Sequence, residues 1–254
     1  MISINFHRPK KRLTAALLHF GISFSIFVLI IFLLTNSWYP GVYFDTEGGL
    51  QGIKIVAGID VVLGPLLTLI VFNPQKSVRE LTVDIGIIAS IQIIALLWGV
   101  YTLHNQRPVA VVFWNNSFLT VPAQALNEQG YALEKLGILS DAYPPLVYAA
   151  YPVNLADLMK MRDLILKQHL PPHHQTWLYR PLKEHFSEIK PKQLNIDGII
   201  AKHPDVKNQL SSVLGKQHIG NIHDVLYFLL QSKYNNSVLV FDQQARYLGF
   251  INPD

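Results

Sequence analysis

Residues 13–36, LTAALLHFGISFSIFVLIIFLLTN, form an apolar stretch of 24 residues in which His19 is the only titratable group. A helix of that length reaches about 36 Å, which is enough to cross a hydrocarbon core of about 30 Å. A cleaved signal peptide is the alternative interpretation. The apolar core of a signal peptide would be shorter, however, and the residues TNSWYP at 35–40 contain no small-x-small cleavage site. The stretch therefore predicts a membrane-spanning helix.

Two further apolar runs of similar length follow it, at 53–72 and at 81–103. The first of these contains Asp60, and the second has Asp84 near its start. The alternative is a buried helical hairpin within a soluble domain, but three such runs packed together would leave too little polar surface for a soluble domain. We therefore expect three transmembrane helices within a membrane domain at 13–104.

Basic residues in the short connecting segments predict the orientation of these helices. Cations are concentrated in the arm at 1–12, absent from 37–52, and present again at Lys76 and Arg79 between the second and third runs. The positive-inside rule therefore predicts a cytoplasmic amino terminus. Three crossings would put the region at 105–254 outside, in the periplasm of a bacterium with two membranes. The aromatic residues Trp38, Tyr39, Tyr43, Phe44, Trp98 and Tyr101 fit an outer interfacial belt.

The composition excludes several classes of protein. Half of the 254 residues are hydrophobic and only 15% are charged. The net charge is +4, but four of the cations, Arg8, Lys10, Lys11 and Arg12, lie in one short arm before the first run, and the region after the third run carries 14 Lys or Arg against 12 Asp or Glu. That balance provides no basic footprint for nucleic acid, and a basic arm beside a span is better matched to anionic lipid. With no cysteine in the chain, disulfide scaffolds, thiol catalysis and cysteine-ligated zinc are also excluded.

The region at 105–254 reads as an α+β extracytoplasmic domain. The β-prone runs 109–113 and 118–121 flank Asn115-Asn116-Ser117, and the runs 238–241 and 247–251 flank 242–246, so each pair predicts a hairpin. Capping residues at Asn154 and Asn221 predict two helices. The second of these carries apolar residues at helical spacing, Ile222, Val225, Leu226, Leu229 and Leu230. Frequent prolines predict short elements elsewhere.

Asp60 is the most informative residue of the apolar runs. An ionised carboxylate inside a bilayer costs about 2.5 to 3.5 kcal/mol on insertion scales, so it normally faces a bundle interior or a partner. It could receive a polar or cationic group from another membrane helix, or it could hold the three spans together; both interpretations are open. Gly58, Gly64 and Pro65 add a small-residue face and a kink site to the same run. We predict Asp60, Gly58, Gly64 and Pro65 as a partner-binding face in the membrane, with ordinary bundle packing as the alternative.

No pattern in the chain predicts catalysis, a cofactor or a metal. Asp60 and Asp84 lie at opposite membrane depths, which argues against a paired-aspartate protease. Pro171 and Pro172 interrupt the histidines at 169, 173, 174 and 185, so a solvated loop is favoured over a metal site. The common phosphate-loop, dinucleotide, serine-hydrolase and zinc-protease motifs are missing. We therefore expect no catalytic residues and no small-molecule substrate.

Four segments carry a resemblance to a known family: WYPG at 38–41, GIDVVLGPLLTLIVFNP at 58–74, YTL at 101–103 and RPV at 107–109. They resemble the type IV pilin accessory proteins of the TfpX/TfpZ family. The resemblance covers roughly the first half of the chain. From 126 to 254 it is confined to the general arrangement and the terminal strand pair.

The resemblance implies a multi-pass protein of the bacterial inner membrane that assists a type IV pilin before fibre assembly, without catalysis. The spans would contact the pilin helix and the outer domain the pilin head. One rival is a membrane-anchored enzyme acting on pilin or envelope glycans through scattered acid-base residues. A ligand sensor is disfavoured because the inner side offers only a short arm and a short loop. The expected partners are therefore a pilin subunit and membrane lipid.

Overall fold

The structure is a computed structural model that describes residues 9–253, and these residues divide into two compact units. The first unit comprises residues 9–44 and Gly48–His104. The second comprises Asp45–Glu47 and the chain from Asn105 onward. The expected basic arm lies mostly outside the described residues, because only 9–12 of it are described.

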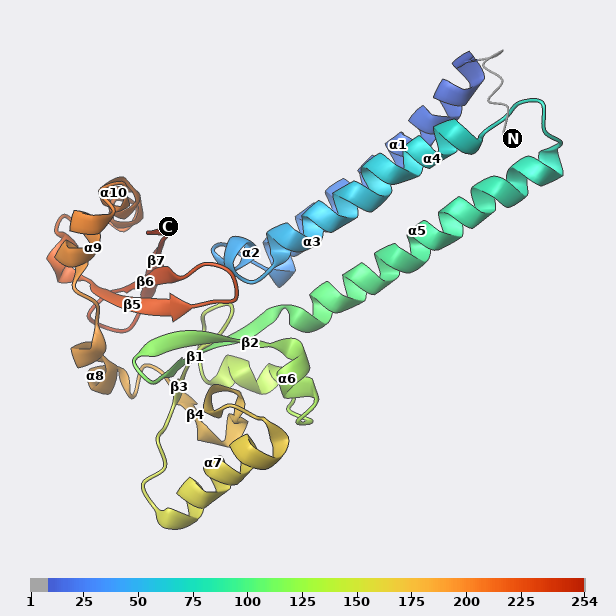
Figure 1. The fold of residues 1–254 in the computed structure, drawn as a ribbon. Helices are drawn as coiled ribbons and strands as arrows, with labels where there is room; N and C mark the ends of the chain where they lie inside the picture. Colours follow the sequence, from blue (N-terminus) through green and yellow to red (C-terminus); the bar gives the residue numbers. More distant parts are fainter. Residues whose placement is uncertain (1–8, 254) are drawn as a thin grey trace. The chain divides into compact units, whose positions relative to one another are not determined.

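The first unit is helical. Among residues 9–253, three continuous helical segments are long and apolar enough to cross a membrane, Lys10–Trp38, Gly49–Val71 and Val78–Gln106, which confirms the three predicted apolar helices. Figure 1 shows α1 alongside α3 and α4. The elements are α1 (Pro9–Leu33), η1 (Leu34–Trp38), α2 (Tyr43–Thr46), α3 (Gly49–Val56), η2 (Ala57–Leu63), α4 (Gly64–Val71) and α5 (Val78–Gln106).

Most side chains of these helices do not pack on one another. Large apolar residues such as Leu29 and Trp98 are 66% and 72% exposed, respectively. A cluster of buried apolar residues lies at one end of the unit, where the Tyr39 hydroxyl donates to the Leu103 carbonyl oxygen at 2.9 Å. Gly52 lies against Leu103 there, so closely that a Cβ at Gly52 would collide with that side chain.

The second unit contains a mixed sheet, in which the described strands have the order β4-β3-β1-β2-β5-β6-β7. The β1–β2 and β6–β7 hairpins confirm the two predicted hairpins, while β1 with β3 and β2 with β5 are parallel pairs. Asn115 and Asn116 form the first turn with positive φ values of 49° and 70°. The strands are β1 (Pro108–Trp114), β2 (Ser117–Pro122), β3 (Leu146–Ala149), β4 (Tyr179–Pro181), β5 (Leu226–Gln231), β6 (Ser237–Phe241) and β7 (Tyr247–Ile251).

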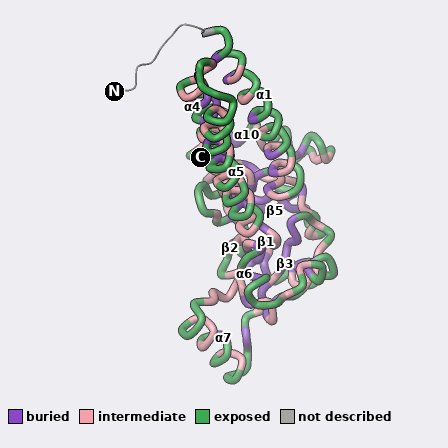
Figure 2. Tube along the Cα trace, turned by 90° about the vertical axis from the view of Figure 1, so that its right-hand side faces the viewer, coloured by how far each residue is buried: buried purple, intermediate pink, exposed green. Residues whose placement is uncertain are grey.

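Two helices cover different parts of this sheet. In α7, Met161 packs with Val112 and Val147, and in α10, Leu210 packs with Val240. Figure 2 shows that β1, β3 and β5 carry runs of buried positions, whereas α7 is largely exposed. The remaining elements are α6 (Ala123–Asn127), η3 (Leu133–Ile138), α7 (Leu155–Gln168), η4 (Pro172–His174), η5 (Thr176–Leu178), α8 (Phe186–Ile189), η6 (Lys190–Lys192), α9 (Ile196–Lys202), α10 (Val206–Lys216) and η7 (Ile222–Asp224).

One of the two capped helices is confirmed and the other is wrong. The Asn154 side chain accepts a hydrogen bond from the backbone N–H of Asp157 and begins α7 as predicted. Asn221 caps only the short turn η7, and the residues after it form strand β5. Since β5 lies between β2 and β6 and is buried along most of its length, its unbroken apolar run belongs to a central strand.

The segment Asp45–Glu47 is folded into the sheet unit although it lies far from it in sequence. The Thr46 carbonyl oxygen accepts from the backbone N–H of Tyr234 at 3.1 Å, and Glu47 accepts from the Thr120 hydroxyl at 2.7 Å. Glu47 is only 3% exposed, and this burial raises the pKa of its carboxyl against the opposing effects of Thr120 and Lys233. The sheet unit thus includes a buried carboxylate supplied by the loop that precedes the second apolar helix.

Candidate partner-binding site

A widened helical turn sets the position of Asp60. Residues Ala57–Leu63 form η2, in which the backbone N–H of Gly64 bonds to the carbonyl oxygen of Ile59, five residues earlier. Pro65 follows and has no N–H to donate, so the regular i to i−4 ladder is interrupted at this point. Wide turns of this kind are frequent at functional sites. This one places Asp60 inside the helical unit, where it is 6% exposed.

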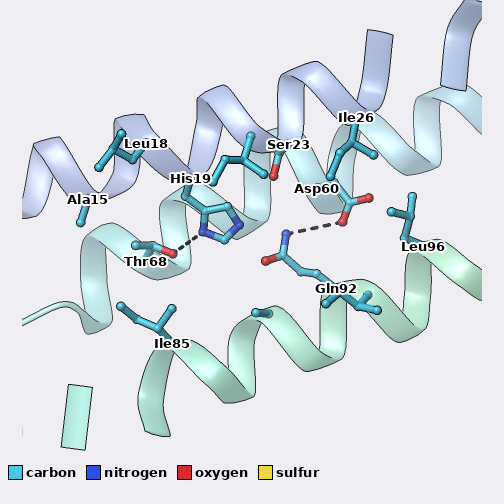
Figure 3. Close-up of a pocket in the computed structure, with 13 residues that line it drawn as sticks. Ala15, Leu18, His19, Ser23, Ile26, Asp60, Thr68, Ile85, Gln92 and Leu96 are labelled. Carbon is cyan, nitrogen blue, oxygen red and sulfur yellow. Dashed lines mark hydrogen bonds between the residues drawn. The ribbon is translucent and has the colours of Figure 1, made fainter. Parts of the chain in front are cut away.

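Two polar pairs lie between the three long helices (Figure 3). The Gln92 amide on α5 donates from Nε2 to Asp60 Oδ1 at 3.5 Å, which is a long hydrogen bond. About two helical turns further along the second helix, Thr68 Oγ1 lies 2.6 Å from His19 Nδ1 on α1. Each pair joins the second helix to one neighbour, so the two pairs together connect all three helices.

A cavity of about 440 Å³ separates these helices around the polar pairs. It is lined by one face of α1 between Ala15 and Ile26, by Asp60 and Thr68, and by one face of α5 between Ile85 and Leu96. Most of its wall is apolar. Gln92 is one of the lining residues, and within the described residues its Oε1 atom is buried and has no hydrogen-bond partner. A buried acceptor of this kind costs free energy until a donor reaches it.

Three of the four residues predicted as a partner-binding face point inward. Asp60, Gly64 and Pro65 are buried. Gly64 packs against Gln92 so closely that a Cβ there would collide with the amide group. Gly58 is exposed instead, and a Cβ at this position would meet no atom within 4 Å. The four residues therefore lie on two different faces of the second helix.

The sequence interpretation missed Gln92, Ser23 and Thr68 as members of this site and left His19 without a role. Ser23 lines the cavity and is 6% exposed. Gln92 is the single amide between Ile85 and Leu103, and an isolated polar residue within a membrane-length helix is a signal in its own right. Asp84 is not part of the site, because it pairs with Lys76 at the other end of the helical unit.

The histidines at 173, 174 and 185 of the sheet unit lie in two separate contacts. The rings of His173 and His174 contact edge-on at 4.4 Å, and burial lowers the pKa of each to about 4. They are half-buried, which corrects the expectation of a solvated loop. His185 stacks on Tyr148 and bonds to Glu188 at 2.8 Å. Among residues 9–253, no group of three or more His, Cys, Asp or Glu residues is arranged to hold a metal ion.

A hollow of the sheet unit has a volume of about 960 Å³ and is lined by both Glu184 and Asp242. Asp242 is engaged within its own turn: its carboxylate accepts from the backbone N–H groups of Gln244 and Arg246 and from the Arg246 side chain at 2.8 to 3.1 Å. This carboxylate therefore serves the β6–β7 turn.

Comparison with known proteins finds relatives named for fimbrial assembly. The chain is 41% identical over 96 residues, 38% of its length, to three proteins of Dichelobacter nodosus: the fimbrial assembly proteins of serogroups C1 and C2, of serogroup E1 and of serogroup I. The match spans 73% of the first relative but only 37% of each of the other two. No family model matches the chain. No solved structure matches it either.

Proposed function

Because the chain belongs to the family of fimbrial assembly proteins represented in Dichelobacter nodosus, we propose that it is a pilin accessory protein of type IV pilus biogenesis. In this role it binds a type IV pilin subunit in a chaperone-like way, makes no covalent change and needs no cofactor. The proposed role is that of the TfpX/TfpZ accessory proteins, which the first half of the chain resembles.

The proposed location is the bacterial inner membrane, with the sheet unit in the periplasm. Exposed apolar side chains along three membrane-length helices need an apolar solvent, and this supports insertion. The cations Lys10, Lys11 and Arg12 near the start of α1, and Lys76 and Arg79 before and within α5, support a cytoplasmic amino terminus. A pilin that carries one membrane helix and an outer head would then meet helices and a folded domain at matching depths.

One observation carries this proposal beyond the family relation. The three apolar helices enclose polar groups around a cavity and leave Gln92 Oε1 without a partner. A bundle built only for anchoring gains nothing from a buried acceptor that stays unpaired. A bundle that receives another helix gains from polar residues along its cavity, because polar contacts help to hold helices together in lipid. Asp60, Gly58, Gly64 and Pro65 remain the proposed partner-binding residues, with Asp60 at the cavity and Gly58 on the exposed face of the same helix.

The test is the substitution Asp60→Leu in the full-length protein, expressed from its own locus. We expect fewer surface pili, counted by electron microscopy, with the protein still present in the membrane fraction at its normal level. The physical reason is that Leu removes the acceptor for the Gln92 amide and changes the polar wall of the cavity.

Ser25→Leu is the matched control. Ser25 is an exposed polar residue on α1 whose hydroxyl bonds only within its own helix, to the Gly21 carbonyl oxygen. This change also exchanges a small polar side chain for Leu inside an apolar helix, and we expect normal piliation from it. Unchanged piliation in Asp60→Leu, with the protein present, would refute the role given to Asp60.

A further inference from the structure

A pocket of about 240 Å³ lies in the sheet unit, outside the carboxyl ends of strands β1 and β3. It is lined by Trp114, the last residue of β1, and by Ala149, the last residue of β3, and the two strands are parallel neighbours. Beyond these ends, β1 turns back into β2 whereas β3 continues toward α7. Ligands commonly bind at the carboxyl ends of parallel strands, where the connecting segments leave in different directions.

Aromatic rings form one part of the pocket wall. The rings of Trp114 and Tyr151 stack with their centroids 5.6 Å apart and their planes inclined by 17°. Tyr151 is 62% exposed, so much of its ring is open to a ligand. Tyr148, stacked on Phe113 at 6.4 Å, adds another ring. The face of an aromatic ring is electron-rich and therefore attracts C–H groups, which carry a small positive charge.

Glu188 supplies a fixed hydrogen-bond acceptor to the same wall. Its carboxylate accepts from the Tyr148 hydroxyl at 2.9 Å and bonds to His185 Nδ1 at 2.8 Å. The bonds from His185 and Tyr148 lower the pKa of Glu188, so the carboxylate stays ionised. The side chain is 55% exposed, and each of its oxygens has a further lone pair. Glu188 can therefore accept hydrogen bonds from a ligand without losing the two that hold it.

Hydrogen-bond donors complete the wall. The exposed side chains of Asn115, Asn116 and Lys192 line the pocket. The two amides both donate and accept, whereas the Lys192 ammonium group only donates. Lys192 and Glu188 carry opposite charges, so the wall has no net charge. The pocket thus combines aromatic rings with donors and acceptors and has no preference for an ion.

These properties match the chemistry of a sugar ring. A pyranose presents C–H groups on a face, and its edge carries hydroxyls that each donate and accept hydrogen bonds. An acyl chain would cover the amides and the carboxylate without bonding to them, which is unfavourable. A phosphate would bring its negative charge close to Glu188. The volume is below the range of roughly 300 to 1,000 Å³ that is typical of larger ligands, and it suits a single ring.

We propose that this pocket binds one neutral sugar unit of a glycan. The C–H face of the sugar lies against Tyr151, and its hydroxyls bond to Asn116 and Glu188. No covalent bond is made or broken. The site adds glycan recognition to the sheet unit and does not depend on the proposed accessory function, so either proposal can fail without the other.

The experiment is saturation-transfer difference NMR on the full-length protein. The protein is purified in lauryldimethylamine oxide, because the headgroup of a glucoside or maltoside detergent would compete for the pocket. The probes are methyl β-D-glucopyranoside, methyl β-D-galactopyranoside and methyl N-acetyl-β-D-glucosaminide. We expect at least one of them to bind, with more saturation on its ring protons than on its methyl group. Sorbitol, which has the hydroxyls but no rigid ring face, should give no signal. No signal from any of the three glycosides would overturn the proposal.

Two tyrosine variants test the ring face. Tyr151→Ala removes the exposed ring from the pocket, whereas Tyr234→Ala removes a ring that is 52% exposed and lies outside it. We expect the affinity for the bound glycoside, measured by titration, to fall about fivefold in the first variant because a stacking contact is lost. It should not change in the second. An affinity that Tyr151→Ala leaves unaltered would overturn the proposal.

Two asparagine variants test the polar edge. Asn116→Gly removes an amide from the pocket and keeps the turn, because glycine readily adopts the positive φ of 70° found there. Asn235→Gly removes an exposed amide outside the pocket. We expect about a threefold loss of affinity from the first, the size of a typical hydrogen bond, and none from the second. Equal affinities of the two variants would refute the contact assigned to Asn116.

A competing class of ligand and the source of the sugar are distinguished by the same method. Proline-rich peptides also bind aromatic grooves, so a decamer of proline is included as a probe. Binding of this peptide through Tyr151, without binding of any glycoside, would overturn the proposal. Displacement of the bound glycoside by soluble peptidoglycan fragments would identify an envelope glycan. Displacement by glycopeptides cleaved from surface proteins would identify a glycan carried by a protein.

Discussion

At the scale of single residues, Gly64 and Gln92 pack against each other in the candidate site. Gly64 has no side chain, and this allows the Gln92 amide to approach the backbone of the second helix and reach Asp60. The same approach buries the amide oxygen beside Gly64, where it has no hydrogen-bond partner among the described residues. One glycine therefore determines both the pairing of Asp60 and the position of the unpaired acceptor.

His173 and His174 predict a pH dependence of stability in the sheet unit. Burial lowers the pKa of each to about 4 in the folded protein, against an ordinary value of 6.5, so the unfolded chain binds protons first as the pH falls. Stability is therefore complete above pH 6.5 and decreases as the pH falls from 6.5 to about 4. We expect the thermal unfolding midpoint of the detergent-solubilised protein, followed by circular dichroism, to fall across this range.

The control for this prediction compares how steeply the unfolding midpoint falls with pH in different variants. His173→Gln and His174→Gln should each flatten the decline, while His223→Gln, at a side chain that is 56% exposed, should leave it unchanged. Glu47 acts in the opposite direction, because its raised pKa makes the folded state bind protons more readily. The measurements therefore belong in a Glu47→Gln background. A midpoint that stays constant between pH 6.5 and 4 in that background would contradict the burial of the two imidazoles.

The sequence identified part of the site because single residues carry strong signals. An aspartate inside an apolar run is conspicuous, and so is a Gly-Pro pair beside it. The sequence does not identify the hydrogen-bond partners of these residues. Gln92 reaches Asp60 only at one particular rotation and axial position of the third helix relative to the second. The outward position of Gly58 likewise depends on how the second helix is rotated about its axis. Small residues within the helix do not determine that rotation.

At the scale of elements, the two hairpins and strand β5 show which local patterns were sufficient. Consecutive asparagines with positive φ terminate β1 and start β2, so the first hairpin has a local cause. The run at 226–230 has apolar residues at both helical and strand spacing, and its pattern is ambiguous. The run forms a strand because it pairs with β2 and β6. The pairing with β2 involves residues far away in the chain.

The side chain at the centre of β5 supplies a stability prediction. Phe228 is fully buried. Its ring centroid lies 5.7 to 6.0 Å from the ring centroids of Phe113, Phe118, Phe186 and Phe241. We expect Phe228→Ala to lower the free energy of unfolding by about 3 to 5 kcal/mol, because it leaves a cavity among these rings. Urea unfolding of the detergent-solubilised full-length protein, followed by tryptophan fluorescence, measures this change.

Tyr234→Ala serves as the comparison for Phe228→Ala. The Tyr234 side chain is 52% exposed, and its backbone contact with Thr46 does not depend on the side chain. We expect its removal to change the free energy of unfolding by no more than about 0.5 kcal/mol. A loss below about 1 kcal/mol for Phe228→Ala would show that the aromatic cluster does not act as the core of the sheet unit.

At the scale of the whole molecule, composition predicted the two kinds of unit but not the path of the chain between them. Long apolar runs and a mixed polar region are enough to expect membrane-length helices before an α+β domain. The strand order and the inclusion of Asp45–Glu47 in the sheet unit depend on contacts between distant segments. No local pattern in the sequence reports such contacts.

The proposed orientation is tested with single cysteines, because the natural chain contains none. Gln75→Cys lies in the loop between α4 and α5, Glu134→Cys lies in the sheet unit, and both positions are exposed. We expect a membrane-impermeant maleimide applied to spheroplasts to label Glu134→Cys at once, and Gln75→Cys only after the membrane is permeabilised. The reverse pattern would place the sheet unit in the cytoplasm and contradict the proposed location.

The buried loop carboxylate of the sheet unit has a consequence for biosynthesis. Thr120, which bonds to Glu47, leaves the ribosome 73 residues after it, and Tyr234, which bonds to Thr46, leaves roughly 190 residues after Thr46. At about 5 to 20 residues per second, translation of the longer interval takes about 10 to 40 s. During that time Thr46 lacks its hydrogen-bond partner, because Tyr234 has not yet been synthesised. The proposed pilin accessory protein therefore completes its own sheet unit only near the end of its synthesis.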